Sequence, residues 1–295
     1  MENYLDINRK LWNAKVDSHL KSDFYFVDEF IKGRTSLNSI ELELLKEIKG
    51  KEILHLQCHF GQDSISLSRM GAKVTGVDLS DKAIEAAKDL AQKCGTDTQF
   101  IISDVYELPH VLDQKFDIVY TTYGTIGWLP HLEKWAKVVS HFLKPGGKLI
   151  FVEFHPIVWI FDNDFTFVKY NYFNEEVIVE TNEGTYADRT ANLADQEVSW
   201  NHPTSDVLTS LIQENLHLQS FREYNWSPYP CFQHIEETEK GKFQISKFGN
   251  KIPLVFSLVA EKNKAGRKLL LNHKNLYHCK SKIQTIQSKL KKKGD

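Results

Sequence analysis

Acidic side chains stand directly after two short apolar runs in the first half of the chain. Asp78 ends the run 74–77, and Asp104 comes two residues after the run 99–102. A carboxylate at the end of a buried strand can accept hydrogen bonds from the ribose hydroxyls of a nucleotide. Asp78 also lies 17 residues after Gly61, close to the spacing of about 20 residues in nucleotide-binding βαβ units. These residues predict a nucleoside site.

The turn before this site departs from the usual glycine-rich loop. Between the first apolar run and the following helical pattern the sequence is Gln57-Cys58-His59-Phe60-Gly61, with a single glycine. Glycines let a backbone adopt positive φ and approach a ligand closely. A side chain as large as His59 would obstruct the pyrophosphate of a dinucleotide, so the turn disfavours NAD.

Strand and helix patterns alternate around these residues. We expect parallel strands at 53–56, 74–77, 99–102, 116–121 and 148–154. Ser80 can cap a helix that stops at Gly95, and a second helix covers 131–143. Two further strands are expected at 218–224 and 254–260. Five strands alternating with helices, followed by two more, predict a doubly wound, mostly parallel seven-stranded sheet of the α/β class.

The remaining segments suggest a division of the chain. Residues 1–36 form a predicted helical cap over the ligand-binding edge, although an ordinary packing role fits the aromatic pattern of 5–31 equally well. Residues 37–261 form the main domain, with a β-rich insertion at 157–202, and residues 262–295 form a basic tail. Asn8, Trp12, Asn13 and His19 are the polar groups that the cap offers to a site.

Composition and apolar patterning disfavour a membrane-spanning protein, a secreted protein and a cysteine-ligated metal site. The chain has 295 residues, 41% of them hydrophobic, which is enough for a substantial core. No apolar run reaches the roughly 20 residues of a membrane span, and the N-terminus lacks the apolar centre of a signal peptide. The four cysteines are scattered without metal-ligand spacing, so no metal is expected. We expect a cytoplasmic protein.

The net charge of −2 conceals a basic C-terminus. The segment 262–295 contains 11 Lys or Arg residues and one acid, so the rest of the chain is acidic. Basic blocks are often solvated or disordered. RNA or membrane-surface contact is the less favoured alternative for this tail, and the body shows no electrostatic footprint for nucleic acid.

Five successive motifs resemble one family. LQCHFGQDS, VTGVDLS, SDVYELP, FDIVYTTYG and FLKPGGKLIFVE, within residues 50–155, are similar to the motifs of class I S-adenosylmethionine-dependent methyltransferases. The resemblance implies methyl transfer, S-adenosylmethionine as cofactor and S-adenosylhomocysteine as product. A small-molecule acceptor is the main hypothesis. The alternatives are a cofactor-binding protein without transfer activity and an RNA methyltransferase that uses the tail.

The resemblance assigns cofactor contacts along these motifs. Asp78 would bind the ribose hydroxyls, with a surface turn acid as the alternative. Asp104 would receive the adenine amino group, with a helix cap as the alternative. At the methionine end His55, Gln57 and His59 replace the family's first acid and first two glycines. The remaining predicted contacts are Leu79 and Val105 on the adenine ring, Gly61 and Gln57 at the methionine end, His59 at the carboxylate, and Tyr123.

Methyl transfer from a sulfonium is an in-line displacement, in which positioning supplies most of the catalysis. Aromatic faces stabilise a cationic sulfonium, and Tyr123, Trp128 and Trp12 are suitable. An acceptor that loses a proton needs a base near neutral pKa. His155 is the first choice, followed by His131 and His202. A structural, hydrogen-bonded histidine is the alternative for each of the three.

The insertion after the fifth strand is expected to form the acceptor wall. It contributes Tyr186, Arg189 and His202. Arg189 could bind a carboxylate or phosphate through two parallel hydrogen bonds, which would suit an anionic acceptor. An ion pair of Arg189 with Asp188 or Glu183 is the equally weighted alternative. Thr122-Tyr123-Gly124-Thr125 replaces the NPPY-like motif of enzymes that methylate DNA bases or glutamine.

Overall fold

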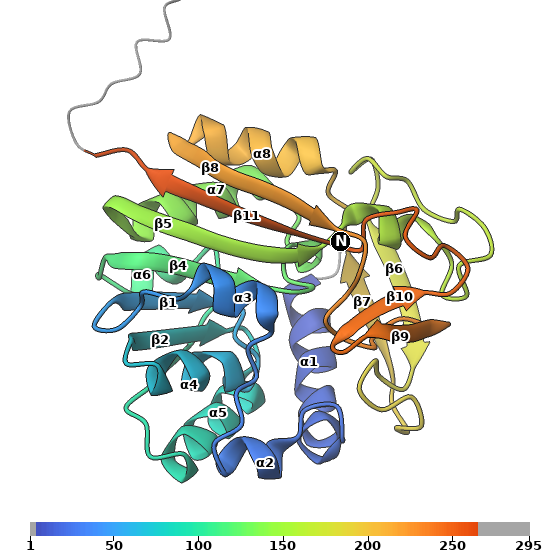
Figure 1. Cartoon of the computed structure of the whole chain (residues 1–295), viewed down its shortest axis with the longest axis horizontal. Helices are drawn as coiled ribbons and strands as arrows, with labels where there is room; N and C mark the ends of the chain where they lie inside the picture. The colour runs from blue at the N-terminus through green and yellow to red at the C-terminus, as the bar shows by residue number, and fades with distance from the viewer. Residues whose placement is uncertain (1–3, 265–295) are drawn as a thin grey trace, which may run out of the picture. The chain divides into compact units, whose positions relative to one another are not determined.

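The computed structural model describes residues 4–264, and within them one seven-stranded sheet organises the chain (Figure 1). The strand order is β3-β2-β1-β4-β5-β11-β8. All neighbours up to β5 pair in parallel, and β11 is antiparallel to both β5 and β8. The strands are β1 (Glu52–Leu56), β2 (Lys73–Asp78), β3 (Gln99–Ile102), β4 (Phe116–Thr122), β5 (Leu143–Phe154), β8 (Leu216–Tyr224) and β11 (Val255–Lys262). The predicted mostly parallel sheet is confirmed.

Helices pack on both faces of this sheet through apolar stripes. The side-chain oxygen of Ser80 accepts a hydrogen bond from the amide of Ala83, so the predicted cap of α5 is present. Trp135 of α7 is fully buried and packs beside Phe151 of β5. The helices in this part of the chain are α4 (Gln62–Arg69), α5 (Asp81–Lys93), α6 (Leu108–Val111), η1 (Ile126–Trp128), α7 (Leu132–Phe142), η2 (Pro156–Ile160) and α8 (Thr204–Gln213).

The segment Lys144 to Gly147 differs from the predicted stop after α7. It belongs to the beginning of β5, where the pairing register with β4 shifts near Phe116. A Cβ on Gly147 would lie 2.9 Å from the carbonyl oxygen of Lys144, so this close approach requires glycine. Lys144 contacts Glu52 and Asp117 at 2.6 and 3.1 Å.

The N-terminal segment forms two helices, α1 (Tyr4–Lys21) and α2 (Val27–Ile31), followed by a short α3 (Ser39–Leu44). Figure 1 shows α1 beside the carboxyl ends of the parallel strands, between the sheet and β7. Residues up to Lys262 form one compact unit. The finer boundary at residue 36 stays a prediction.

The insertion contains an antiparallel pair, β6 (Ile178–Glu183) and β7 (Ala194–Ser199), which is separate from the main sheet. Between η2 and β6, the strand pairing of the insertion is limited to an isolated bridge between Phe161 and Val168. A second pair, β9 (Ile235–Glu239) and β10 (Lys242–Ile245), lies before β11 and was not predicted. Across residues 4–264, helices with the length and apolarity of a membrane span are absent. The predicted tail lies almost entirely outside the described residues.

Candidate functional site

A cavity of about 1440 Å³ opens at the carboxyl ends of the parallel strands. Single-ligand pockets usually occupy about 300–1,000 Å³, so this one has room for two small molecules. Its walls come from α1, the loops after β1 to β5, the insertion and the segment before β11. It brings together every predicted cofactor and acceptor residue: Trp12, Gln57, His59, Gly61, Asp78, Leu79, Asp104, Val105, Tyr123, Trp128, Tyr186, Arg189 and His202.

The turn after β1 keeps a left-handed backbone at alternate residues. The φ angles of Gln57, His59 and Gly61 are 55°, 49° and 78°. Non-glycine residues seldom adopt such angles, and when they do they cluster at functional sites. The turn therefore follows a path that suits glycine, although two of the three positions carry side chains. Their side chains make tertiary contacts that hold this path.

Gly61 is required for a reason other than the one expected. The sequence suggested that a Cβ at this position would collide with a ligand. In the structure the Cβ would lie 2.6 Å from the ring of Phe100 and 3.0 Å from Ala87, on the core side of the turn. The close packing of α5 and β3, together with the positive φ, requires glycine here.

Asp78 lies at the end of β2 and organises the turn. Its Oδ2 accepts a hydrogen bond from the amide of His59 at 2.8 Å, and its Oδ1 accepts one from the amide of Ser80 at 2.9 Å. Burial raises the pKa of Asp78 to about 6, and these amide bonds counteract part of that rise. Each carboxylate oxygen has two lone pairs, so each retains capacity for a further donor from the cavity.

Asp104 follows β3 and also faces the cavity. Its Oδ1 accepts a hydrogen bond from the amide of Tyr106 at 3.2 Å. The carboxylate does not cap α6, whose N-cap residue is Glu107. Burial raises the pKa of Asp104. Val105 is buried and Leu79 half-buried at the same cavity.

Helix α1 contacts the turn and the start of α5. His19 Nδ1 lies 2.9 Å from His59 Nε2. Burial lowers the pKa of His19 to about 3 and also lowers that of His59, so both imidazoles are neutral near pH 7. Asn13 accepts a hydrogen bond from the Ser80 hydroxyl at 2.6 Å and donates one to Asp81 at 2.8 Å. The N-terminal helix is thus part of the site's framework.

Gln57 presents an unsatisfied acceptor. Its Nε2 donates to the carbonyl oxygen of Thr125 at 2.8 Å, which fixes the orientation of the amide because two oxygens would not bond to each other. Its Oε1 is buried and lacks a hydrogen-bond partner among the residues that the structure describes. A buried acceptor of this kind costs about 1–3 kcal/mol, so a donor from a ligand would stabilise it.

The cavity does not include His155 or His131. His155 Nδ1 accepts a hydrogen bond from the amide of Ile157, and its Nε2 lies 3.0 Å from Glu223 of β8. His131 is about half exposed before α7, with Nδ1 3.6 Å from Glu133. The sequence placed His155 just after the fifth strand and His131 at the start of a helix, but in the structure their side chains contact other partners. Neither is positioned to take a proton from a molecule in the cavity.

His202 lines the cavity but both ring nitrogens are engaged. Its Nε2 donates to the carbonyl oxygen of Leu129 at 2.7 Å, and its Nδ1 lies 3.3 Å from the amide nitrogen of Asn174. Burial lowers its pKa. These contacts fit the structural role that was the alternative for this histidine.

Aromatic side chains cover the loop after β4. Trp12 and Trp128 contact edge to face, with ring centroids 5.3 Å apart. Tyr123 has a φ of 41°, and its buried hydroxyl has no partner with hydrogen-bond geometry among residues 4–264. Glu153 at the end of β5 holds this loop, because its carboxylate accepts hydrogen bonds from the amides of Gly124 and, at 2.7 Å, Thr125.

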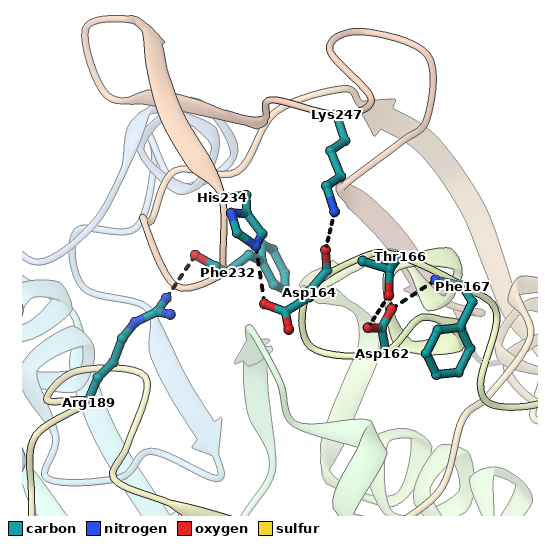
Figure 2. A network of polar contacts seen from close by, with 8 residues as sticks. All are labelled: Asp162, Asp164, Thr166, Phe167, Arg189, Phe232, His234 and Lys247. Carbon is teal, nitrogen blue, oxygen red and sulfur yellow. Dashed lines mark hydrogen bonds and ion pairs between the residues drawn. The ribbon is translucent and has the colours of Figure 1, made fainter.

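The insertion is joined to the segment before β11 by polar contacts (Figure 2). Arg189 donates to the carbonyl oxygen of Phe232 at 2.8 Å. His234 Nε2 lies 3.1 Å from Asp164, and Lys247 donates to the Asp164 carbonyl oxygen at 2.9 Å. In the described part of the chain, Arg189 forms no ion pair with Asp188 or Glu183. One guanidinium nitrogen of the exposed Arg189 side chain is therefore already hydrogen-bonded to the backbone of the cavity wall.

Two carboxyl groups near the cavity were not singled out from the sequence. Asp63, on the first turn of α4, lines the cavity, and Glu41 of α3 is fully buried behind it. Burial raises the pKa of Glu41 to about 7, and the charge of Asp63 adds to the rise. Asp63 could have been identified from the sequence as an acid two residues after Gly61, at the start of the helix that follows the turn. Nothing in the sequence marked Glu41.

Comparisons with known proteins agree with this geometry. Residues 53–147 match a family model described as a methyltransferase domain. A ubiquinone biosynthesis O-methyltransferase from Coxiella burnetii is 31% identical over 137 residues, which cover 45% of this chain and 58% of the relative. A sterol 4-C-methyltransferase from Caenorhabditis elegans is 26% identical over 143 residues, which cover 46% and 42%. The chain thus spans about half the length of these curated relatives.

The fold has counterparts among solved structures. The crystal structure of an S-adenosylmethionine-dependent methyltransferase from Clostridium acetobutylicum has a TM-score of 0.53 and 16% sequence identity, and the match covers 87% of this chain and 98% of that one. At this identity the likeness concerns the fold. Together with the match of residues 53–147 to a methyltransferase-domain model, the shared fold agrees with the resemblance seen in the motifs.

Proposed function

We propose that the protein transfers a methyl group from S-adenosylmethionine to a small-molecule acceptor. The observation that carries the proposal is a single cavity in which Asp78, Asp104 and the left-handed turn Gln57 to Gly61 meet at the carboxyl ends of the strands. The family match over residues 53–147 and the names of the curated relatives support the same reaction class.

The residues present fit the cofactor. The lone pairs of Asp78 that remain would suit ribose hydroxyls, Asp104 would suit the adenine amino group, and Leu79 and Val105 line the same cavity for contact with the ring. The unpartnered Oε1 of Gln57 suits an ammonium group. When bound, the cofactor supplies an electrophilic methyl group on a cationic sulfur. The chain's own residues bind it, align the acceptor and exclude water.

The acceptor occupies the remaining part of the cavity. Trp12, Trp128 and Tyr186 line it, and Tyr186 is held by the hydroxyl of Tyr25 at an O···O distance of 2.5 Å. Aromatic faces of this kind favour a flat or cationic group. Arg189 extends from the same wall, and an anionic substituent of the acceptor would engage its exposed edge.

A proton leaving the acceptor has a route through Tyr123. Tyr123 lines the cavity, and its buried hydroxyl has no partner of hydrogen-bond geometry among residues 4–264; the residue lies near enough to Glu41 for each to shift the pKa of the other. With a pKa of about 7, Glu41 is partly ionised at neutral pH and can accept a proton relayed by the hydroxyl. We therefore retain Tyr123 among the catalytic residues and no longer assign that role to His155 and His131.

The alternative of binding without transfer rested on the missing glycines. The left-handed angles at Gln57 and His59 support transfer over this alternative, because the turn retains a backbone path that suits glycine. RNA methylation rested on residues 262–295, which lie almost entirely outside the described part of the chain.

Titration calorimetry with the full-length protein tests the proposal. We expect S-adenosylmethionine and S-adenosylhomocysteine to bind and NAD to give no heat of binding. Binding of NAD together with no response to either sulfur compound would refute it. A screen of amine, hydroxyl and thiol compounds for release of S-adenosylhomocysteine then identifies the acceptor class.

A further inference from the structure

Asp63 is a carboxylate that lines the cavity and has an incomplete set of partners. Its Oδ1 accepts a hydrogen bond from the Ser36 hydroxyl at 2.6 Å. Its Oδ2 lies 3.3 Å from the hydroxyls of both Tyr120 and Thr122. Hydrogen bonds between hydroxyl and carboxylate oxygens are normally about 2.5–3.0 Å, so the contacts to Oδ2 are weak. A carboxylate accepts about four hydrogen bonds, and capacity on Oδ2 remains.

Within the described part of the chain, the Asp63 carboxylate has no ion-pair partner, since no Lys, Arg or His nitrogen lies within ion-pair distance of it. Its surroundings are the neutral hydroxyls already named and the carboxyl of Glu41. Burial raises the pKa of Asp63. A buried carboxylate with no positive partner is costly, and a cationic ligand would relieve that cost.

Asp63 also lies beside the methionine end of the proposed site. It stands two residues after the turn and contacts Tyr120, whose ring also packs on His55 at 4.8 Å. His55 carries no charge, because burial lowers its pKa to about 3, and its Nδ1 is engaged with the Ser64 hydroxyl at 2.8 Å. The negative charge near the end of β1 is therefore supplied by Asp63.

We propose that Asp63 binds the α-ammonium group of S-adenosylmethionine. Asp63 is the charged partner of this group, and Gln57 Oε1 accepts a hydrogen bond from the same ammonium. This inference rests on the proposed function, because it requires the cofactor to lie along the turn. It assigns to Asp63 a binding role distinct from its contacts with Ser36, Tyr120 and Thr122.

The test compares two ligands in calorimetry at pH 7.5. One is S-adenosylhomocysteine, and the other is the analogue that carries hydrogen in place of its α-amino group. For Asp63→Asn we expect affinity for S-adenosylhomocysteine to fall at least about tenfold, since charged hydrogen bonds are the strong ones. Affinity for the deaminated analogue should change less than about twofold, because it has no cation to lose.

Asp89→Asn on the exposed face of α5 is the control for a change in net charge, and both affinities should stay at the wild-type value. Ser36→Ala keeps the carboxylate but removes its 2.6 Å donor. This second variant serves if thermal unfolding shows that Asp63→Asn does not fold. In Ser36→Ala only the affinity for S-adenosylhomocysteine should change, and the affinity for the deaminated analogue should stay at the wild-type value.

Equal losses for the two ligands, or no loss for either, would overturn the role of Asp63 while leaving cofactor binding intact. A wild-type protein that binds neither ligand would instead refute the proposed function.

Discussion

At the scale of single residues, the turn after β1 shows how a glycine loop can be kept without its glycines. Left-handed conformations cost about 1–2 kcal/mol for residues with a Cβ. The cost is offset by contacts that each position makes: His59 donates its amide to Asp78 and its imidazole meets His19, while Gln57 donates to Thr125. The loop geometry therefore depends on its neighbours more than on local freedom.

Asp78 is the residue on which nucleoside binding should depend most. Replacing it with alanine removes the acceptors for the ribose hydroxyls and an anchor of the turn. We expect the dissociation constant for S-adenosylhomocysteine to rise at least about tenfold, since each hydrogen bond to a charged group contributes about 1.5–3 kcal/mol. Calorimetry measures it, with the exposed Asp97→Ala as control. An unchanged constant would contradict the ribose role.

Glu41 should make the stability of the ligand-free protein depend on pH. Its pKa is about 7 in the fold against an ordinary 4.5, so the folded state binds the proton more tightly than the unfolded state. The resulting stabilisation is present below about pH 4.5 and is lost as pH rises through about 7.

Glu41→Gln should reduce this dependence. Urea unfolding at pH 5 and at pH 8 measures the free energy of unfolding of each protein. From pH 5 to pH 8 this free energy should fall by about 2 kcal/mol less in Glu41→Gln than in the wild type, as the linkage relation requires. Glu43→Gln, an exposed neighbour on the same helix, should behave as the wild type. A parallel fall in all three proteins would show that Glu41 is ionised without penalty.

At the scale of elements, α1 connects two parts of the cavity wall. The Asn8 side chain donates to the carbonyl oxygen of Val198 in β7 at 2.8 Å and accepts a hydrogen bond from the Val198 amide at 3.0 Å. It thereby satisfies both backbone groups, as an adjacent strand would. His19 and Asn13 contact the turn and α5. The helix thereby fixes the insertion relative to the sheet.

Asn8→Ala should loosen that connection. Two buried backbone groups of Val198 would lose their partners, at a cost of about 1–3 kcal/mol each. Hydrogen exchange should show faster exchange at the Val198 amide and along β7, with β1 and β4 unaffected. Arg9→Ala, on the exposed side of α1, is the matched control. Undiminished protection of β7 in Asn8→Ala would show that other contacts suffice.

At the scale of the whole molecule, the described lining of the cavity comes entirely from the unit that ends at Lys262. The lining residues end at Phe243, and Lys262 closes β11 by donating to the carbonyl oxygens of Ser140 and Leu143. The acidic body and the basic segment carry charges of opposite sign.

Removal of residues 265–295 should leave affinity for S-adenosylhomocysteine within about twofold of the full-length value, because every lining residue identified among residues 4–264 is retained. Calorimetry on the truncated and full-length chains checks this. Gel-shift titration with a structured RNA in the same pair tests the tail separately, and RNA affinity that disappears with the tail would favour the RNA hypothesis. A large loss of cofactor affinity would mean that the tail takes part in the site.

The sequence by itself determined the sheet and the cofactor edge. Buried parallel strands are near-continuous apolar runs, and the residues after them must gather at one edge of the sheet. Asp78, Asp104 and the turn around Gly61 could therefore be placed from spacing alone. The β9–β10 pair was missed because its residues are mostly polar and exposed.

Only the tertiary structure decided which side chains face the cavity. The position of a residue after a strand does not fix the direction of its side chain, so His155 turned to Glu223 while Gln57 remained in the site. The environments of Glu41 and Asp63 depend on how α3 packs against β5 and on how Asp63 of α4 meets Tyr120 and Thr122 of β4, which no local pattern records. The raised pKa values of these carboxyls follow from that packing, because desolvation is a property of the folded environment.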